Sequence, residues 1–230
     1  MNEPINSVSL KDVSLVIATY NEEECIQYVL DELQQFDLGE IIIVDGNSTD
    51  NTKLIAERYD VKFISQSKKG WGSAVKEGIG LTTLSFVTYI DGDGSYNPKA
   101  LIEMRNLIDS NDAVFCSRYK DGAKSPDDTP LRAFGNKMFT LIVKVLFGPK
   151  ISDSLFFYPM FKKTILNQIN LDSDDFTLCL EMPVKVHQKG LKYVEILSEE
   201  RKRYAGVTKV NALTDGFKIL MGILALRSKM

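Results

Sequence analysis

The first half of the chain alternates short apolar runs with segments of helical periodicity, and this alternation limits the folds open to it. The apolar runs are residues 13–19, 40–44, 61–65, 85–91 and 113–117. Near-continuous stretches of Val, Ile and Leu are typical of strands buried on both faces of a parallel sheet. Helices are expected between them, over residues 22–36, 52–59, 72–78 and 98–109. This order predicts an α/β fold with a mostly parallel, Rossmann-like central sheet flanked by helices.

Polar residues follow several of these runs at the point where each expected strand ends. Asp45, Asp91 and Arg118 come directly after the second, fourth and fifth runs. Ligands bind outside the carboxyl ends of the strands in such sheets, so these residues predict one shared site. Asn21, after the first run, is expected to cap the next helix, with Glu22 in its first turn.

The run that ends at Asp91 continues as Asp91-Gly92-Asp93-Gly94. In an extended strand the two carboxylates would face opposite ways, but a turn at Gly92 can bring both onto one hard cation. Two carboxylates, together with phosphate oxygens and water, are a usual way of holding Mg²⁺ or Mn²⁺ beside a nucleoside diphosphate. Taken alone, the tetrapeptide is also the composition of an ordinary solvated turn.

The second half of the chain carries fewer regular signals. Residues 120–129 form a charged loop long enough to act as a lid, and a helix is expected over residues 131–147. Further elements are expected as a strand over 153–161, helices over 163–169 and 177–188, and a strand over 192–197. The sequence contains no repeat or clear domain boundary. We expect a single catalytic domain over residues 1–209 and an amphipathic C-terminal helix over 210–230.

Four short motifs then occur in order, each after the appropriate element. They are Ala18-Thr19-Tyr20-Asn21-Glu22, Val44-Asp45-Gly46-Asn47-Ser48-Thr49-Asp50, Lys69-Gly70-Trp71-Gly72 with Gly78, and Asp91-Gly92-Asp93. Together they resemble the inverting family 2 glycosyltransferases of the GT-A fold, and most of all the dolichyl- or polyprenyl-phosphate sugar synthases. The resemblance covers roughly residues 14–209. Each motif alone is loose, whereas four in register are specific.

The resemblance implies a role for each motif residue. It implies that the base and ribose of a UDP- or GDP-sugar are held by Thr19, Tyr20, Glu22 and Asp45, with Lys69 and Gly70 also on the donor side. It further implies that Asp91 touches the ribose or the metal and that Asp93 binds the metal, Mg²⁺ or Mn²⁺. Simpler interpretations stay open: Tyr20 as a core aromatic, Asp45 as a turn residue and Lys69 as a solvated loop charge.

Four arginines extend the expected site, since guanidinium groups match phosphate oxygens bidentately. In the resembled subgroup, arginines corresponding to Arg118 and Arg132 clamp the acceptor phosphate. A late segment, here Arg201 to Lys209 with Thr208 in place of the family's serine, closes over the donor through Arg201 and Arg203. The alternative is that residues 201–203 form a solvated basic face.

The acceptor decides which further chemistry is needed. A phosphate dianion is already a nucleophile, whereas a sugar hydroxyl needs a general base within hydrogen-bond reach. Asp153 is the best candidate base. The segment Asp153-Ser154-Leu155-Phe156-Phe157 lacks a glycine that the family carries there, and Ser95 stands where many relatives have glutamine. Transfer to a glycan hydroxyl therefore stays open beside transfer to a polyprenyl phosphate, as does a module that binds sugar nucleotides without turnover.

Composition excludes several other classes. The net charge of −3 argues against a nucleic-acid partner, and three scattered cysteines with one histidine argue against a usual zinc site. With no signal-peptide core and no apolar run near the ~20 residues that span a bilayer, we expect a cytoplasmic protein. Residues 210–230 suggest a basic amphipathic helix. It is suited to peripheral contact with the cytosolic face of a membrane, to a membrane partner, to a second copy in a homodimer or to its own core.

Overall fold

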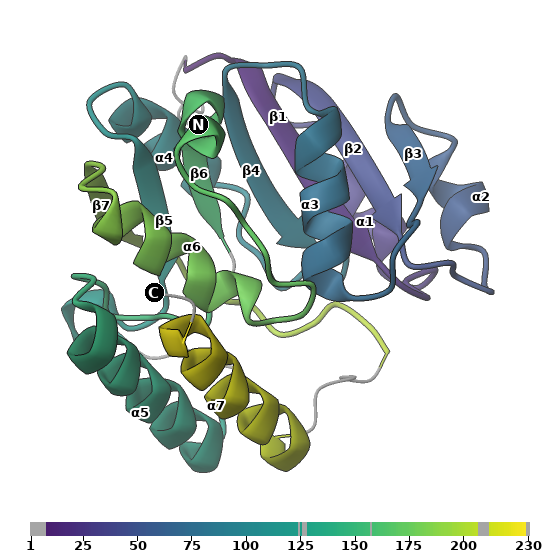
Figure 1. The fold of residues 1–230 in the computed structure, drawn as a ribbon. Helices are drawn as coiled ribbons and strands as arrows, with labels where there is room; N and C mark the ends of the chain where they lie inside the picture. Colours follow the sequence, from purple (N-terminus) through teal and green to yellow (C-terminus); the bar gives the residue numbers. More distant parts are fainter. Residues whose placement is uncertain (1–7, 124, 126–127, 157, 207–211, 229–230) are drawn as a thin grey trace.

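A computed structural model describes residues 8–123, 125, 128–156, 158–206 and 212–228, with only the backbone described for 212–215. One sheet runs through the molecule (Figure 1). Its strands are β1 (Leu10–Thr19), β2 (Leu38–Asp45), β3 (Lys62–Ser65), β4 (Phe86–Asp91), β5 (Ala113–Ser117), β6 (Pro159–Lys162) and β7 (Tyr193–Leu197). The order across the sheet is β3-β2-β1-β4-β6-β5-β7. Only β6 is antiparallel to its neighbours, β4 and β5, so the prediction of a mostly parallel α/β sheet is confirmed.

Helices cover both faces of this sheet (Figure 1). One face packs against α1 (Ile26–Leu33), α2 (Thr52–Ala56) and α4 (Ala100–Ile108). The other packs against α3 (Trp71–Leu81) and α6 (Leu178–Gln188), with a short 3₁₀ helix, η2 (Lys163–Asn167), beside them. Within the helix expected over residues 22–36, six apolar residues at helical spacing are all buried, in α1 or just beside it: Cys25, Ile26, Val29, Leu30, Leu33 and Phe36. Hydrophobic burial on both faces therefore fixes the layers.

Two helices lie away from the sheet. The helix α5 (Pro130–Phe147) follows a 3₁₀ turn, η1 (Lys120–Gly122), and α7 (Ala212–Ser228) lies beside α5 (Figure 1). Both pack against α6 through a third apolar cluster that includes Val143, Leu180 and Ile223. Among the described residues, none of the helices combines the length and hydrophobicity needed to cross a bilayer.

Two local predictions were wrong. Asn21 does not cap a helix: α1 begins at Ile26, and Asn21 has a positive φ of 51° while its Oδ1 accepts the Thr49 N–H at 2.8 Å. The strand expected over 153–161 is only β6, because the Asp153 carboxylate accepts the Leu155 N–H at 3.1 Å and turns the chain. The helix expected over 163–169 is present as the shorter 3₁₀ helix η2.

Candidate active site

The carboxyl ends of β1, β2 and β4 lie side by side at the point where the strand order reverses. Thr19 is in register with Asp45, and Ala18 with Asp91. The buried Thr19 hydroxyl donates to Asp45 Oδ1 at 3.2 Å, which ties the ends of β1 and β2 together. A crevice at such a reversal is the usual ligand position in open α/β sheets. The structure thus brings together the strand-end residues that the sequence singles out.

Asp45 also organises the loop that follows β2. Its carboxylate accepts the Ser48 N–H at 2.7 Å and the Ser48 hydroxyl at 2.5 Å. Asp45 is therefore a turn residue, as the simpler interpretation holds, and it stands at the rim as well. Tyr20, by contrast, is 51% exposed, so it is not a core aromatic. Its side chain lies beside Gly46 at this rim.

Asp91 and Asp93 occupy the end of β4 in different environments. Asp91 accepts a hydrogen bond from the indole N–H of Trp71, a ring that stacks on Phe176 with centroids 5.3 Å apart. Burial and the Asp93 charge raise the pKa of Asp91 to about 7, and the Trp71 hydrogen bond opposes this rise. Asp93 Oδ1 accepts the Ser95 N–H at 3.0 Å and the Ser95 hydroxyl at 2.7 Å. Its other oxygen, Oδ2, faces Arg203.

Residues 201–206, which we call the strap, cross this acidic end of the sheet. Arg203 ion-pairs with the buried Glu22 carboxylate, and its Nη1 lies 3.5 Å from Asp93 Oδ2. The backbone N–H of Tyr204 donates to the Asp93 carbonyl at 3.0 Å. Arg203 thus places one cation between two of the expected donor-side carboxylates. A solvated basic face, the alternative for residues 201–203, does not describe Arg203.

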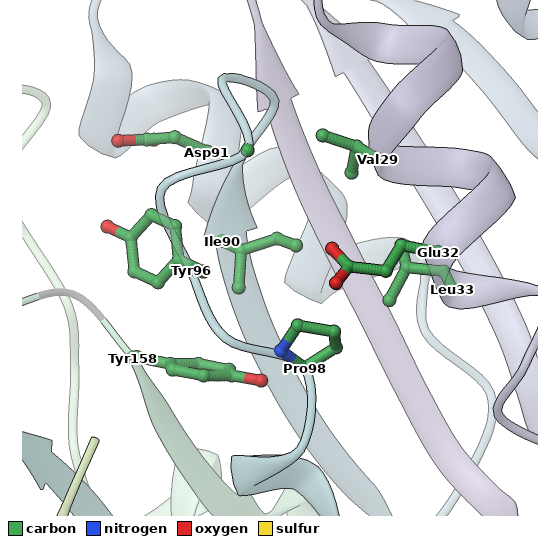
Figure 2. Close-up of a pocket in the computed structure, with 9 residues that line it drawn as sticks. Val29, Glu32, Leu33, Ile90, Asp91, Tyr96, Pro98 and Tyr158 are labelled. Carbon is green, nitrogen blue, oxygen red and sulfur yellow. The ribbon is translucent and has the colours of Figure 1, made fainter. Parts of the chain in front are cut away.

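Arg201 fixes the other end of the strap. Its guanidinium binds Glu32 with two hydrogen bonds of 2.7 and 2.8 Å and also donates to the Tyr28 hydroxyl at 3.2 Å. Tyr204 stacks on the Tyr28 ring at 4.0 Å between centroids. Glu32 lines a small pocket between α1 and the segment after β4, shared with Ile90, Asp91 and Tyr96 (Figure 2). Arg201 therefore anchors the strap rather than facing the carboxylates at the end of β4.

The loop before α3 is held by an acidic residue from before α6. Asp174 pairs with Lys68 and with Lys76, the latter at 2.8 Å, while Lys69 is exposed. Gly70 has a φ of +126°, and a Cβ there would lie 2.2 Å from the Asp174 carbonyl oxygen, so only glycine fits. This packing carries Trp71 to Asp91. Lys69 matches a solvated loop charge in this structure, although it lies near the donor side.

Arg118 and Asp153, both expected on the acceptor side, bind each other. Arg118 Nε and Nη2 donate to the two Asp153 oxygens at 2.7 and 3.1 Å, and both side chains are buried. Glu200, just before the strap, accepts from Arg118 Nη1 at 3.2 Å. Arg132 lies in the first turn of α5, where its backbone N–H donates to the Thr129 hydroxyl at 3.3 Å. The expected Thr208 and Lys209 lie outside the described residues.

Sequence reasoning missed several partners of these residues. Trp71 appears there only as part of a glycine motif, and neither Glu32 nor Glu200 is singled out. An apolar indole beside two glycines was a usable signal, because a buried Trp normally finds an acceptor for its N–H. Glu32 lies 169 residues from its partner Arg201, and Glu200 lies 82 residues from its partner Arg118, so no short spacing marks either pair.

The carboxylates at the end of β4 fit a hard divalent cation. Asp91 and Asp93 supply oxygen ligands of the kind that Mg²⁺ and Mn²⁺ prefer, and Glu22 lies across Arg203 from Asp93. Within the described part of the chain, no group of three His, Cys, Asp or Glu side chains forms a ready metal cage. A cation here would complete its shell with phosphate oxygens and water, the usual arrangement for Mg²⁺ at a nucleotide.

Comparison with known proteins gives one family. The family model described as "Glycosyl transferase family 2" matches residues 14–170. The chain is 28% identical to Glycosyltransferase AglJ of Haloferax volcanii, over 89% of this chain and 68% of that protein. It is also 28% identical to the Dolichyl-phosphate hexose transferase of the same organism, over 90% of both chains.

Solved structures agree on the fold. Glucosyl-3-phosphoglycerate synthase from Mycobacterium tuberculosis, in complex with Mn²⁺, UDP and glucosyl-3-phosphoglycerate, superposes with a TM-score of 0.73. The match covers 94% of this chain and 80% of that one at 16% identity. The same enzyme with Mg²⁺ and UDP gives a TM-score of 0.72. The expected GT-A fold is thereby confirmed.

Proposed function

This chain belongs to glycosyl transferase family 2 and is a glycosyltransferase, and we propose that it transfers a hexose from a UDP- or GDP-sugar to a polyprenyl phosphate. The observation that best supports a sugar-nucleotide donor is the group of carboxylates at the end of β4. Asp91 and Asp93 lie there at the switch point of the sheet, and Arg203 is the cation between Asp93 and Glu22. Such a cluster suits a divalent cation and a diphosphate.

On the donor side, we assign the base and ribose to the rim formed by Thr19, Tyr20, Glu22 and Asp45, with Lys69 and Gly70 beside it. Asp91 and Asp93 would hold Mg²⁺ or Mn²⁺, which when bound offsets the charge that develops on the departing diphosphate. Support comes from the neighbouring fold, because the mycobacterial synthase was solved with UDP and either Mn²⁺ or Mg²⁺. Arg203, close to the same carboxylates, would bind the diphosphate through its guanidinium when the donor enters.

The reaction is an in-line displacement at the anomeric carbon. A phosphate oxygen of the acceptor forms the new bond to this carbon as the bond to the donor diphosphate breaks, and the bonding electrons leave with the diphosphate. The configuration inverts because attack comes from the opposite face. A phosphate dianion needs no base for this step, whereas a sugar hydroxyl does.

The state of Asp153 favours the phosphate acceptor. Asp153 is the candidate base for a hydroxyl, but its two oxygens are held by the Arg118 guanidinium at 2.7 and 3.1 Å. Because both Asp153 oxygens already accept charge-assisted hydrogen bonds from one guanidinium, neither is directed at a substrate hydroxyl. The relative named as a dolichyl-phosphate hexose transferase, similar over 90% of both chains, supports the same choice. Arg118 and Arg132 are the cations we assign to the acceptor phosphate.

A polyprenyl phosphate is held in a bilayer by its hydrocarbon chain. The proposal therefore places the enzyme at the cytosolic face of a membrane during turnover. It assigns the catalytic work to residues 1–209 and treats residues 210–230 as an appended amphipathic helix, of which α7 is the described part.

The test is release of nucleoside diphosphate from UDP-, GDP- and dTDP-sugars with Mg²⁺ or Mn²⁺, with and without a short-chain polyprenyl phosphate. The proposal predicts that release of the nucleoside diphosphate needs both the metal and the lipid phosphate. It also predicts a strong preference for the sugar nucleotide of one nucleobase. Metal-dependent donor binding with release only when a glycan is supplied would favour a hydroxyl acceptor instead. If no sugar nucleotide binds, the proposal fails.

A further inference from the structure

Two helices expose an unusual number of large apolar side chains. On α5 these are Leu131, Phe134, Met138, Leu141 and Val145, and on α7 they are Phe217, Leu220, Met221 and Leu224. We call these nine residues the apolar face. Val145 is 75% exposed, Phe134 68% and Phe217 65%. Single exposed apolar residues are ordinary on a protein surface, whereas a contiguous group of this kind marks an interaction site.

The apolar face is separate from the side of each helix that builds the core. In α5 the buried residues are Thr140, Val143 and Phe147, which lie on the opposite side of the helix from Leu141 and Val145. In α7 the buried residues are Ile223 and Leu226. Those buried sides meet α6 in one cluster. The fold is therefore complete without the apolar face, and folding alone does not explain it.

The two helices that carry this face are neighbours. They lie side by side at one end of the molecule (Figure 1). The helix expected over residues 131–147 is formed. Seven apolar residues recur in it at helical spacing, and only Ile142 and Leu146 among them are not exposed. The exposed stripe of α5 repeats at spacings of three and four residues, which keeps it on one side of the helix over its whole length.

The charges on these helices have one sign. The sequence of α5 contains Arg132, Lys137 and Lys144 and no Asp or Glu, and α7 contains Lys218 and Arg227 with one acidic residue, Asp215. At about 100° per residue, Lys137 and Lys144 both border one side of the stripe of α5, while Lys218 and Arg227 lie on either side of that of α7. Apolar side chains bordered by Lys and Arg are the composition of helices that lie in a membrane interface.

We propose that the apolar face docks on a bilayer that contains anionic lipids, with α5 and α7 lying in the interface. This inference rests on the proposed function, because it says how the enzyme meets a lipid-linked acceptor. The charge of this surface favours an anionic bilayer as its partner. The cations that border the apolar face complement anionic headgroups, while the apolar side chains enter the boundary of the acyl chains.

A second copy of the chain fits this surface less well. A two-fold interface pairs the same patch on both subunits, so Lys137, Lys144 and Arg227 of both subunits would border one interface. The described sides of the two helices offer no carboxylate to offset them. Like charges brought together at an interface oppose association.

The position of α5 connects this surface to the acceptor side of the site. Tyr119 follows Arg118, and its hydroxyl accepts a hydrogen bond of 2.9 Å from Asn136 of α5. The Lys137 ammonium lies over the Tyr119 ring, 5.7 Å from its centroid. Docking through α5 would thus hold Arg118 close to the membrane surface from which a lipid phosphate arrives.

Sedimentation with vesicles tests the inference without donor, metal or acceptor. The full chain is mixed with phosphatidylcholine vesicles and with vesicles that contain phosphatidylglycerol. We expect binding to the anionic vesicles that weakens with salt, and at least about tenfold weaker binding for a Leu141→Gln, Phe217→Gln double variant. The matched control is Leu54→Gln, an equally exposed leucine on α2 at the other end of the sheet, which should bind as the unchanged chain does.

Several results would overturn the inference. The first is equal binding to neutral and anionic vesicles, and the second is unweakened binding by the double variant. The third is that the unchanged chain forms a dimer in solution and does not bind vesicles, whereas the double variant is a monomer. Circular dichroism and a melting curve check that the variants fold. The proposed function is judged separately with a short-chain polyprenyl phosphate in detergent. Sugar transfer there without vesicle binding removes only the docking inference, and vesicle binding without transfer removes only the assigned reaction.

Discussion

Arg203 Nη1 lies 3.5 Å from Asp93 Oδ2, so the strap supplies a positive charge next to a carboxylate that we assign to the metal. In the donor-free protein this guanidinium competes with an incoming cation. We predict that Arg203→Gln binds Mn²⁺ about five- to tenfold more tightly, because a neighbouring charge is removed from a partly buried site. Titration of free Mn²⁺ by electron paramagnetic resonance measures this. Lys202→Gln, an exposed neighbour, is the control, and equal affinities in the two variants would refute the competition.

The burial of Asp91 beside the Asp93 charge predicts a pH dependence. With a pKa raised from 3.8 to about 7, Asp91 keeps its proton in the folded chain between those pH values, whereas the unfolded chain has lost it. The contribution of Asp91 to stability therefore decreases as the pH rises from 3.8 to about 7. A metal needs the ionised form. Mn²⁺ affinity should therefore rise with pH up to about 7 and then level off, with a proton released on binding below that pH.

Trp71→Phe should raise the pH at which Mn²⁺ affinity reaches half of its final rise, which we call the midpoint. It removes the N–H donor that stabilises the Asp91 carboxylate while keeping an aromatic ring beside Phe176. We expect the midpoint of the Mn²⁺ affinity profile to rise by roughly one pH unit, the size of a hydrogen bond to a charged group. Phe176→Leu, which keeps the indole donor, is the control. A midpoint that is unchanged in Trp71→Phe would show that the indole does not tune Asp91.

The ion pair between Arg118 and Asp153 predicts a stability change. Asp153→Asn leaves a buried guanidinium with Glu200 as its remaining carboxylate, and we expect the free energy of unfolding to fall by about 2–4 kcal/mol. Arg118→Met combined with Asp153→Leu should recover much of this loss, since no unpaired charge stays at that position. Urea unfolding measures both variants. A stable Asp153→Asn protein would contradict the buried pair.

The same Asp153→Asn variant separates the two acceptor classes. Transfer to a polyprenyl phosphate should change by less than about tenfold per folded molecule, because no base is required. A fall in the transfer rate of about 10²–10⁴-fold, the usual contribution of a general base, would instead indicate a hydroxyl acceptor.

Two glycines of α3 give a matched pair for the packing of the sheet. A Cβ on Gly78 would lie 2.3 Å from Val16 Cγ1, whereas Gly80 has open space around it. Gly78→Ala should lower the free energy of unfolding by about 1–3 kcal/mol through overpacking. Gly80→Ala should be neutral or raise it by up to about 1 kcal/mol, because alanine favours a helix. Equal melting temperatures would mean that α3 does not lie as close to β1 as described.

Local patterns were enough to predict much of this molecule, and contacts distant in sequence were not. The runs that form β1, β2, β4 and β5 are continuous because both faces of each strand are buried, so the sheet and its rim could be predicted. The pairing of Arg118 with Asp153 joins residues 35 apart, and that of Arg203 with Glu22 joins residues 181 apart. No spacing rule marks such pairs, so the sequence predicts the residues of the site without predicting their partners.

Periodicity also failed to say which way a helix faces. The stripe from Leu131 to Val145 has the spacing of a core-facing helix, yet it is exposed, and the core side is the less regular row with Thr140 and Val143. An apolar stripe indicates a partner for the helix, and only the fold shows whether that partner is the protein's own core. The turn at Asn21 was missed for a related reason, since its side chain bonds to Thr49 across the rim instead of capping α1.

The most direct test of the central claim is recovery of radiolabelled sugar in an organic extract after incubation with a UDP- or GDP-sugar, Mn²⁺ and a polyprenyl phosphate. The unchanged chain and Asp60→Asn, an exposed carboxylate remote from the site, should both give a labelled lipid product. Asp93→Asn should give at least about 100-fold less, since it loses a metal ligand at the departing diphosphate. A labelled lipid product formed equally by Asp93→Asn, or formed without metal, would contradict the account.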